Sequence, residues 1–141
     1  SKEGTITGNY QYGQNRLKGD GLITVDRVLK IEHVTIKNAG TGSTVAMWEG
    51  ATCTIDKANI SGSNGSQEGV ITICDSNACT ITNTKVTGNV KSRYGAIMFM
   101  DSCSDCIIGG GAVIETITRI LAASVFTVIV ALKLQLKKAL L

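Results

Sequence analysis

Short runs of alternating apolar and polar residues recur along most of the chain. One motif returns four times: it opens with a leucine or a cysteine, alternates with period two, and closes with an aliphatic residue seven positions on. The copies are LKIEHVTI (29–36), CTIDKANI (53–60), CTITNTKV (79–86) and CIIGGGAV (106–113), and they start 24 to 27 residues apart. A weaker copy, GTITGN (4–9), stands near the N-terminus. A regular repeat of this length indicates a stack of similar units, none of which can bury its apolar face alone.

A second apolar run precedes each motif at a nearly constant distance. These runs are LITVD (22–26), VAMWE (45–49), VITICD (70–75) and AIMFMD (96–101). Each unit thus contains three short strands and a loop rich in glycine and asparagine. The pattern predicts an all-β, single-stranded parallel β-helix of about four coils, whose strands pair with their equivalents about 4.8 Å away. An antiparallel sandwich would need two-residue Asn-Gly turns, and the one Asn-Gly, at Asn64, lies in a long loop instead.

Period two assigns the strand residues to the inside or outside of the coil. Three inward columns are expected: Leu29, Cys53, Cys79 and Cys106; Ile31, Ile55, Ile81 and Ile108; and Ile36, Ile60, Val86 and Val113. The outward positions are Lys30, Thr54, Thr80 and Ile107 in the first strand of the motif, and Thr35, Asn59 and Lys85 in the second. Because leucine opens the first column, the cysteines that follow it are interpreted as small apolar core residues.

The pattern changes near the C-terminus, so the repeat domain is assigned to residues 1–114 and an apolar segment to 115–141. Its uncharged stretch, 120–132, is shorter than the roughly 20 residues of a membrane helix. Apolar residues recur there at helical spacing but also alternate as in a strand, with helix favoured. Either form would cover or extend the open end of the coil; membrane contact and homo-oligomer formation are alternatives.

Composition excludes several classes of protein. The 16 glycines and the absence of proline fit many strands joined by tight turns, and a net charge of +3 without a basic run argues against nucleic-acid binding. Five cysteines cannot all pair within one chain, and neither the lone Cys103-x-x-Cys106 nor His33 makes a zinc site, so no metal is expected. Cys103, which is expected in a turn, is the thiol to test for reactivity. The chain begins with Ser1 and has no signal peptide, which suggests a processed protein or an excerpt.

Acidic residues end the first strand of each unit: Asp26, Glu49, Asp75 and Asp101. If they stack, neighbouring carboxylates would lie about one rung apart, close to the separation in retaining glycosidases. Such carboxylates could serve as catalytic acid and base or bind Ca²⁺. The favoured interpretation is that they accept backbone hydrogen bonds in turns, with no catalytic residues and no cofactor.

Polar loops of unequal length close each coil: KNAGTGST (37–44), SGSNGSQEG (61–69) and TGNVKSRYG (87–95). Loops of this kind on a rigid scaffold commonly carry binding sites. Their side chains offer hydrogen bonds and an aromatic face to a sugar, and Trp48 beside the acidic turn offers another. The candidate ligand-binding residues are Asn64, Gln67, Lys91, Arg93, Tyr94 and Trp48.

Two segments carry a resemblance to known proteins. TGN (87–89) followed by GAI (95–97), with degraded copies ISGS (60–63) and EGVI (68–71), resembles the repeat of right-handed β-helix adhesins of the polymorphic outer-membrane and autotransporter type. The coil is also similar to the wider pectin-lyase-like superfamily. The resemblance implies a right-handed coil and an extracellular or cell-surface module that binds a glycan or a host surface without catalysis. The alternative is a fragment of a polysaccharide lyase, a glycoside hydrolase or a phage tailspike, the last located on the virion tail.

Overall fold

The computed structural model describes residues 4–11, 21–65, 67–75, 78–100, 103, 105–118 and 126–127. All regular secondary structure in these ranges is β-strand, arranged in three sheets. Sheet A contains β1 (Gly4–Gly8), β4 (Val34–Asn38), β7 (Asn59–Ser61), β10 (Lys85–Ser92) and β13 (Val113–Thr118). Sheet B contains β2 (Gly21–Val25), β5 (Ser43–Met47), β8 (Ile71–Cys74), β11 (Ile97–Met100) and β14 (Phe126–Thr127). Sheet C contains β3 (Val28–Glu32), β6 (Thr52–Asp56), β9 (Ala78–Thr82) and β12 (Cys106–Gly109).

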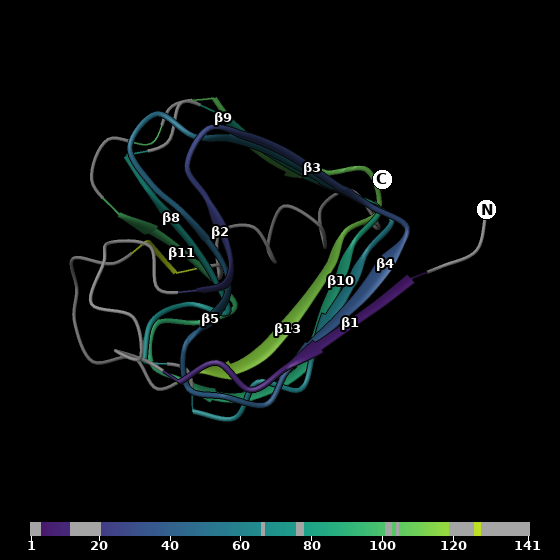
Figure 1. Cartoon of the computed structure of the whole chain (residues 1–141), viewed down its shortest axis with the longest axis vertical. Helices are drawn as coiled ribbons and strands as arrows, with labels where there is room; N and C mark the ends of the chain where they lie inside the picture. Colours follow the sequence, from purple (N-terminus) through teal and green to yellow (C-terminus); the bar gives the residue numbers. More distant parts are fainter. Residues whose placement is uncertain are drawn as a thin grey trace, which may run out of the picture.

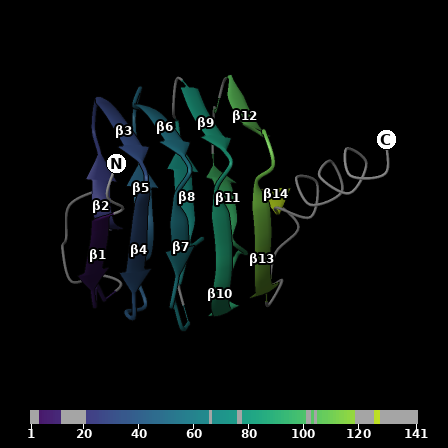
Figure 2. The ribbon, with the colours of Figure 1, turned by 90° about the vertical axis from the view of Figure 1, so that its right-hand side faces the viewer.

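The chain visits the three sheets in turn, so each strand pairs with the third strand after it. All these pairings are parallel, and only β14 runs antiparallel, against β11. In Figure 1 the chain passes clockwise through β2, β3 and β4, starting from the coil nearest the viewer. Figure 2 shows the coils following one another from β1 at one end to β13 at the other. The fold is therefore a parallel β-helix of about four coils, as the repeat predicts, and its hand is right, as the resemblance implies.

The corner between sheets C and A is a short turn with one residue in the left-handed region. His33, Lys57, Asn83 and Gly110 occupy this position in successive coils, with φ of 50°, 51°, 47° and 59°. The backbone N–H of each of the first three donates to a carbonyl on the next coil, at 3.1 to 3.3 Å. This cross-coil ladder satisfies the turn backbone and explains how ordinary side chains are held in a conformation that normally favours glycine.

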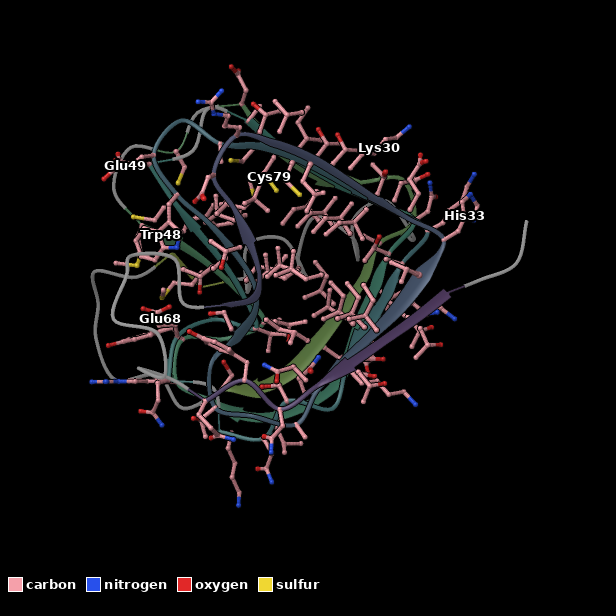
Figure 3. All side chains as sticks on the ribbon, in the orientation of Figure 1. Lys30, His33, Trp48, Glu49, Glu68 and Cys79 are labelled. Carbon is pink, nitrogen blue, oxygen red and sulfur yellow. The ribbon has the colours of Figure 1, made fainter. Side chains whose placement is uncertain are left out.

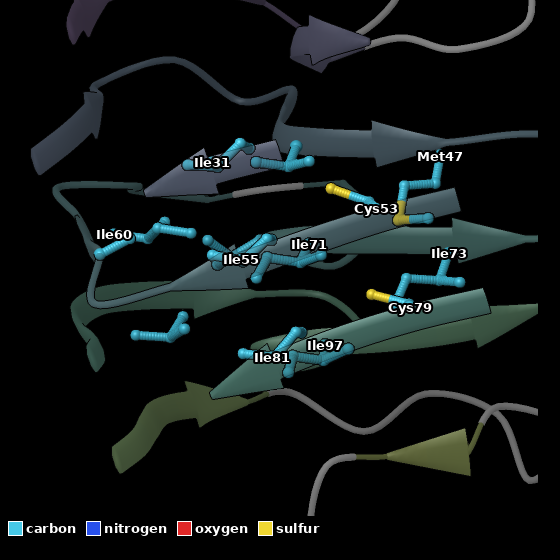
Figure 4. Packing of buried hydrophobic residues seen from close by; sticks show 14 of the residues in the cluster. Ile31, Met47, Cys53, Ile55, Ile60, Ile71, Ile73, Cys79, Ile81 and Ile97 are labelled. Atoms are coloured by element: carbon cyan, nitrogen blue, oxygen red, sulfur yellow. The ribbon is translucent and has the colours of Figure 1, made fainter. Parts of the chain in front are cut away.

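The inward columns of sheet C are confirmed by both register and burial. Cys53 pairs with Cys79 and Ile55 with Ile81, and all four are at most 1% exposed. Figure 4 shows these side chains stacked coil upon coil beneath the strands. Column members at the two ends of the stack are only half-buried: Leu29, Cys106 and Ile108. The core thus runs along the axis of the coil, with each inward position of the motif contributing one column.

The expectation that Val113 points inward is wrong. Val113 pairs with Lys85 and is 42% exposed, whereas Ile114 pairs with Val86 and is 2% exposed. The turn before β13 carries an extra residue, because Gly110 and Gly111 both adopt positive φ where the other coils use one residue. A one-residue insertion reverses which alternate residues face the core. The motif assumed the same turn length in all four copies, so it assigned Val113 to the inside.

The described parts of the C-terminal segment are strands, so the preference for helix is wrong there. β13 continues past residue 114 to Thr118, and β14 pairs with Met98 and Phe99 of β11. The remainder of the segment lies outside the described residues. Among the residues that are described, no helix is long and apolar enough to cross a membrane.

Candidate binding surface

Two buried asparagines support the loops that lead from sheet A to sheet B. The Asn38 side-chain oxygen accepts hydrogen bonds from the backbone N–H of Tyr10 (2.8 Å) and Gly40 (3.1 Å), and its amide donates to the Gly42 carbonyl. Asn38 is fully buried. These hydrogen bonds join the turn of one coil to the backbone of the coil before it. A buried side chain therefore fixes the conformation of the loop.

Asn89 has the same role on a later coil. Its side-chain oxygen accepts from the Ser63 N–H, and its amide donates to the Ile60 carbonyl, both at 3.1 Å. Asn89 is 2% exposed. Sequence reasoning missed both asparagines as structural residues, although each stands close to a glycine: Asn89 follows Gly88, and Asn38 precedes Gly40 by two residues.

The loops of neighbouring coils are also bonded to one another. The Gln67 N–H donates to the Thr41 carbonyl at 2.9 Å, and the Thr41 hydroxyl donates to the Gln11 side chain at 3.0 Å. Asn64 forms an isolated parallel bridge with Val90. The loops of successive coils therefore form one continuous surface, which we call the loop edge: Gln11, Thr41, Asn64, Gln67, Lys91, Arg93 and Tyr94.

Five of the six predicted ligand-binding residues lie on the loop edge. Asn64, Gln67, Lys91 and Arg93 are exposed and Tyr94 is half-buried. The guanidinium carbon of Arg93 lies 5.0 Å from the centroid of the Tyr94 ring. This cation–π contact holds the Arg93 cation against the Tyr94 ring, and the exposed Lys91 lies two residues before Arg93 in the chain. The structure gathers these five residues, and their binding of a ligand stays a prediction.

Trp48, the sixth predicted residue, lies at the corner between sheets B and C. Figure 3 shows it beside Glu49, far from His33 across the coil. Trp48 follows Met47, whose side chain faces the core, so alternation places the indole on the outer side of sheet B. The ring is half-buried, and its Nε1 is buried without a hydrogen-bond partner among the described residues. Trp48 is thus separate from the loop edge.

The acidic residues stack only in part. Register pairs Val25 with Met47 and Met47 with Ile73, so Glu49 and Asp75, each two residues later, occupy equivalent positions. Asp26 directly follows Val25, so it aligns with Trp48 and not with Glu49. The expectation that Asp26 stacks with Glu49 and Asp75 is therefore wrong. The corner after β2 is shorter than those after β5 and β8, and this difference shifts Asp26. Asp101 lies outside the described residues.

Glu49 and Asp75 are both exposed, with φ of 27° and 49°. The Asp75 carbonyl accepts a hydrogen bond from the Gly50 N–H at 2.8 Å. This bond joins the corners of two neighbouring coils. Turn formation accounts for this placement. Among the described residues, no three His, Cys, Asp or Glu side chains are arranged to hold a metal ion. The catalytic and calcium alternatives for the acidic column stay predictions.

Comparison of the chain with protein-family models, with curated proteins and with solved structures gives no match.

Proposed function

We propose that the chain is a cell-surface or extracellular β-helix module that binds a glycan or a host surface through the loop edge, without catalysis of its own. The observation that carries the proposal is the alignment of exposed polar loops from successive coils into one surface, tied by the Gln67–Thr41 and Thr41–Gln11 hydrogen bonds. A scaffold that holds variable loops in fixed positions is well suited to recognition.

The chemistry of the loop edge favours a sugar polymer with acidic groups. Lys91 and Arg93 supply cations, Asn64 and Gln67 supply amide donors and acceptors, and Tyr94 supplies a ring face. A repeating ligand suits a surface whose loops recur at each rung of the coil. The adhesin-type repeat of the polymorphic outer-membrane and autotransporter class agrees with this use, and so does the wider pectin-lyase-like coil.

A polysaccharide-cleaving function is the rival, since Glu49 and Asp75 occupy equivalent positions on neighbouring coils. The two functions predict different products. A binding module retains the glycan unchanged, whereas a lyase or a hydrolase releases new reducing ends.

A glycan-array assay coupled to reducing-end detection tests the proposal. The wild-type chain should bind a subset of acidic glycans without releasing reducing ends. The triple variant Lys91→Ala, Arg93→Ala, Tyr94→Ala should bind them at least about 10-fold more weakly, because it removes both cations and the ring face.

The matched control is the double variant Lys30→Ala, Lys57→Ala, which also removes two cations but from sheet C and its corner. It should bind like the wild type. Equal loss in the control, or no binding by the wild type, would overturn the proposal. Release of reducing ends that disappears in Asp75→Asn would establish the rival.

A further inference from the structure

Three successive coils place a cysteine at the same inward position of sheet C. Cys53 pairs with Cys79, and Cys79 pairs with Cys106. Cys103 precedes β12 at the corner with sheet B, and its thiol lies 3.1 Å from the Met100 carbonyl and 3.3 Å from the Ile73 carbonyl. Figure 3 shows sulfur atoms gathered inside the coil beside Cys79, and none of the five cysteines is in a disulfide. We call Cys53, Cys79, Cys103 and Cys106 the thiol column.

The surroundings of the thiol column are apolar. Figure 4 shows Cys53 and Cys79 among isoleucines and Met47, and all of these belong to the hydrophobic core. Sulfur is the side-chain donor that the column offers, so the site discriminates against hard cations that need oxygen ligands. Thiolates in such a setting select soft ions, of which Cu(I) is the biological example.

The spacing of the column suits two-coordinate binding. Adjacent in-register residues of a parallel sheet are separated by about 4.8 Å. Two metal–sulfur bonds of about 2.3 Å each, laid end to end, span about 4.6 Å. If the two sulfurs keep the spacing of their strands, one ion between two rungs can bond to both, and a linear site requires no third ligand.

The cysteines of the thiol column differ in their exposure to solvent. Cys79 is 1% exposed, whereas Cys106 and Cys103 are half-buried at the last coil of sheet C. Burial raises the pKa of Cys53 to about 11 and raises that of Cys79 further. Cys103 and Cys106 are therefore the members of the thiol column that an ion from solvent meets first.

We propose that Cys79 and Cys106 bind one soft monovalent metal ion of the Cu(I) type in a linear site between two rungs, with Cys103 at its entrance. Two metal–sulfur bonds form, the protons of the ligating thiols pass to solvent, and no electron is transferred. Within the column, the pair formed by Cys79 and Cys106 is the one nearest the half-buried end.

A competition titration tests this site. The reduced chain, kept without oxygen in a phosphine reductant, is titrated with Cu(I) held by excess bicinchoninate, whose absorbance reports transfer to the protein. The wild type should take up one equivalent. Cys79→Ala and Cys106→Ala should each lose at least about 100-fold in affinity, since each removes one of two ligands.

Cys74→Ala is the matched control, because Cys74 is also buried but follows the inward Ile73 and faces the outer side of sheet B. It should bind as the wild type does. Cys106→Ala decides the outcome if Cys79→Ala fails to fold, as circular dichroism would reveal, since Cys106 is only half-buried. Absence of copper uptake by the wild type, unchanged affinity in Cys106→Ala, or equal loss in Cys74→Ala would each overturn the proposal.

Discussion

The hydroxyl of Thr82 donates a 2.8 Å hydrogen bond to the carboxylate of Asp56, its in-register partner on the preceding coil. The Asn83 amide donates a second bond, at 2.9 Å, to the same oxygen. These bonds from Asn83 and Thr82 hold the pKa of Asp56 below its ordinary value of 3.8. One carboxylate thus links two coils across the outer side of sheet C.

Asp56 should make the coil sensitive to acid. A group whose pKa is lower in the folded state contributes stability that is present above its unfolded pKa and is lost as the pH falls through its folded pKa. Urea unfolding between pH 6 and about pH 2 should therefore show a loss of stability below about pH 4 that is smaller in Asp56→Asn. An identical acid profile in Asp56→Asn would contradict the role of this carboxylate.

The register of the last coil can be tested by introducing an aspartate at each of two neighbouring positions. Ile114→Asp should destabilise the chain by more than about 3 kcal/mol, because it buries a carboxylate without a partner. Val113→Asp should change stability by less than about 0.5 kcal/mol, because that side chain is exposed. Thermal unfolding of the two variants distinguishes the positions, and a larger effect at Val113 would restore the register expected from the motif.

The isoleucine column should carry much of the stability of sheet C. Ile81→Ala removes a fully buried side chain and should cost about 2 to 5 kcal/mol in denaturant unfolding. Thr80→Ala, one residue earlier and on the outer face, should cost less than about 1 kcal/mol. Equal losses at the two positions would mean that the alternation of inside and outside has been assigned wrongly.

The buried asparagines should matter for stability while the exposed one does not. Asn89→Ala leaves the Ser63 N–H and the Ile60 carbonyl without their side-chain partner, at about 1 to 3 kcal/mol for each group left unsatisfied. Asn64→Ala removes an exposed side chain and should leave the melting temperature unchanged. A calorimetric scan of both variants gives the comparison, and a stable Asn89→Ala chain would refute the supporting role.

The repeat was enough to predict the coil because each motif position becomes a column when strands stack in register. Cys53, Ile55 and Ile60 could be placed from period two alone, since a single apolar interior imposes the same alternation on every coil. The same logic failed at Val113, where one extra turn residue changed the register without changing the visible motif.

The candidate site was predictable in its residues but not in its geometry. Lys91, Arg93 and Tyr94 stood out as loop residues, whereas the role of the buried Asn38 and Asn89 depends on backbone groups of the neighbouring coil, which only the stacked structure places beside them. The number of residues at each corner decides which residues align, as Asp26 shows, and that number becomes known only when the strands on both sides of the corner are placed in register.

Cross-coil nuclear Overhauser contacts test the central claim, the in-register stacking of the repeats, most directly. The account predicts backbone contacts between Thr54 and Thr80 and between Asn64 and Val90, pairs that are 26 residues apart in the chain. Antiparallel contacts between strands adjacent in sequence, such as β6 with β7, in place of these would contradict the stacked coil and, with it, the continuous loop edge.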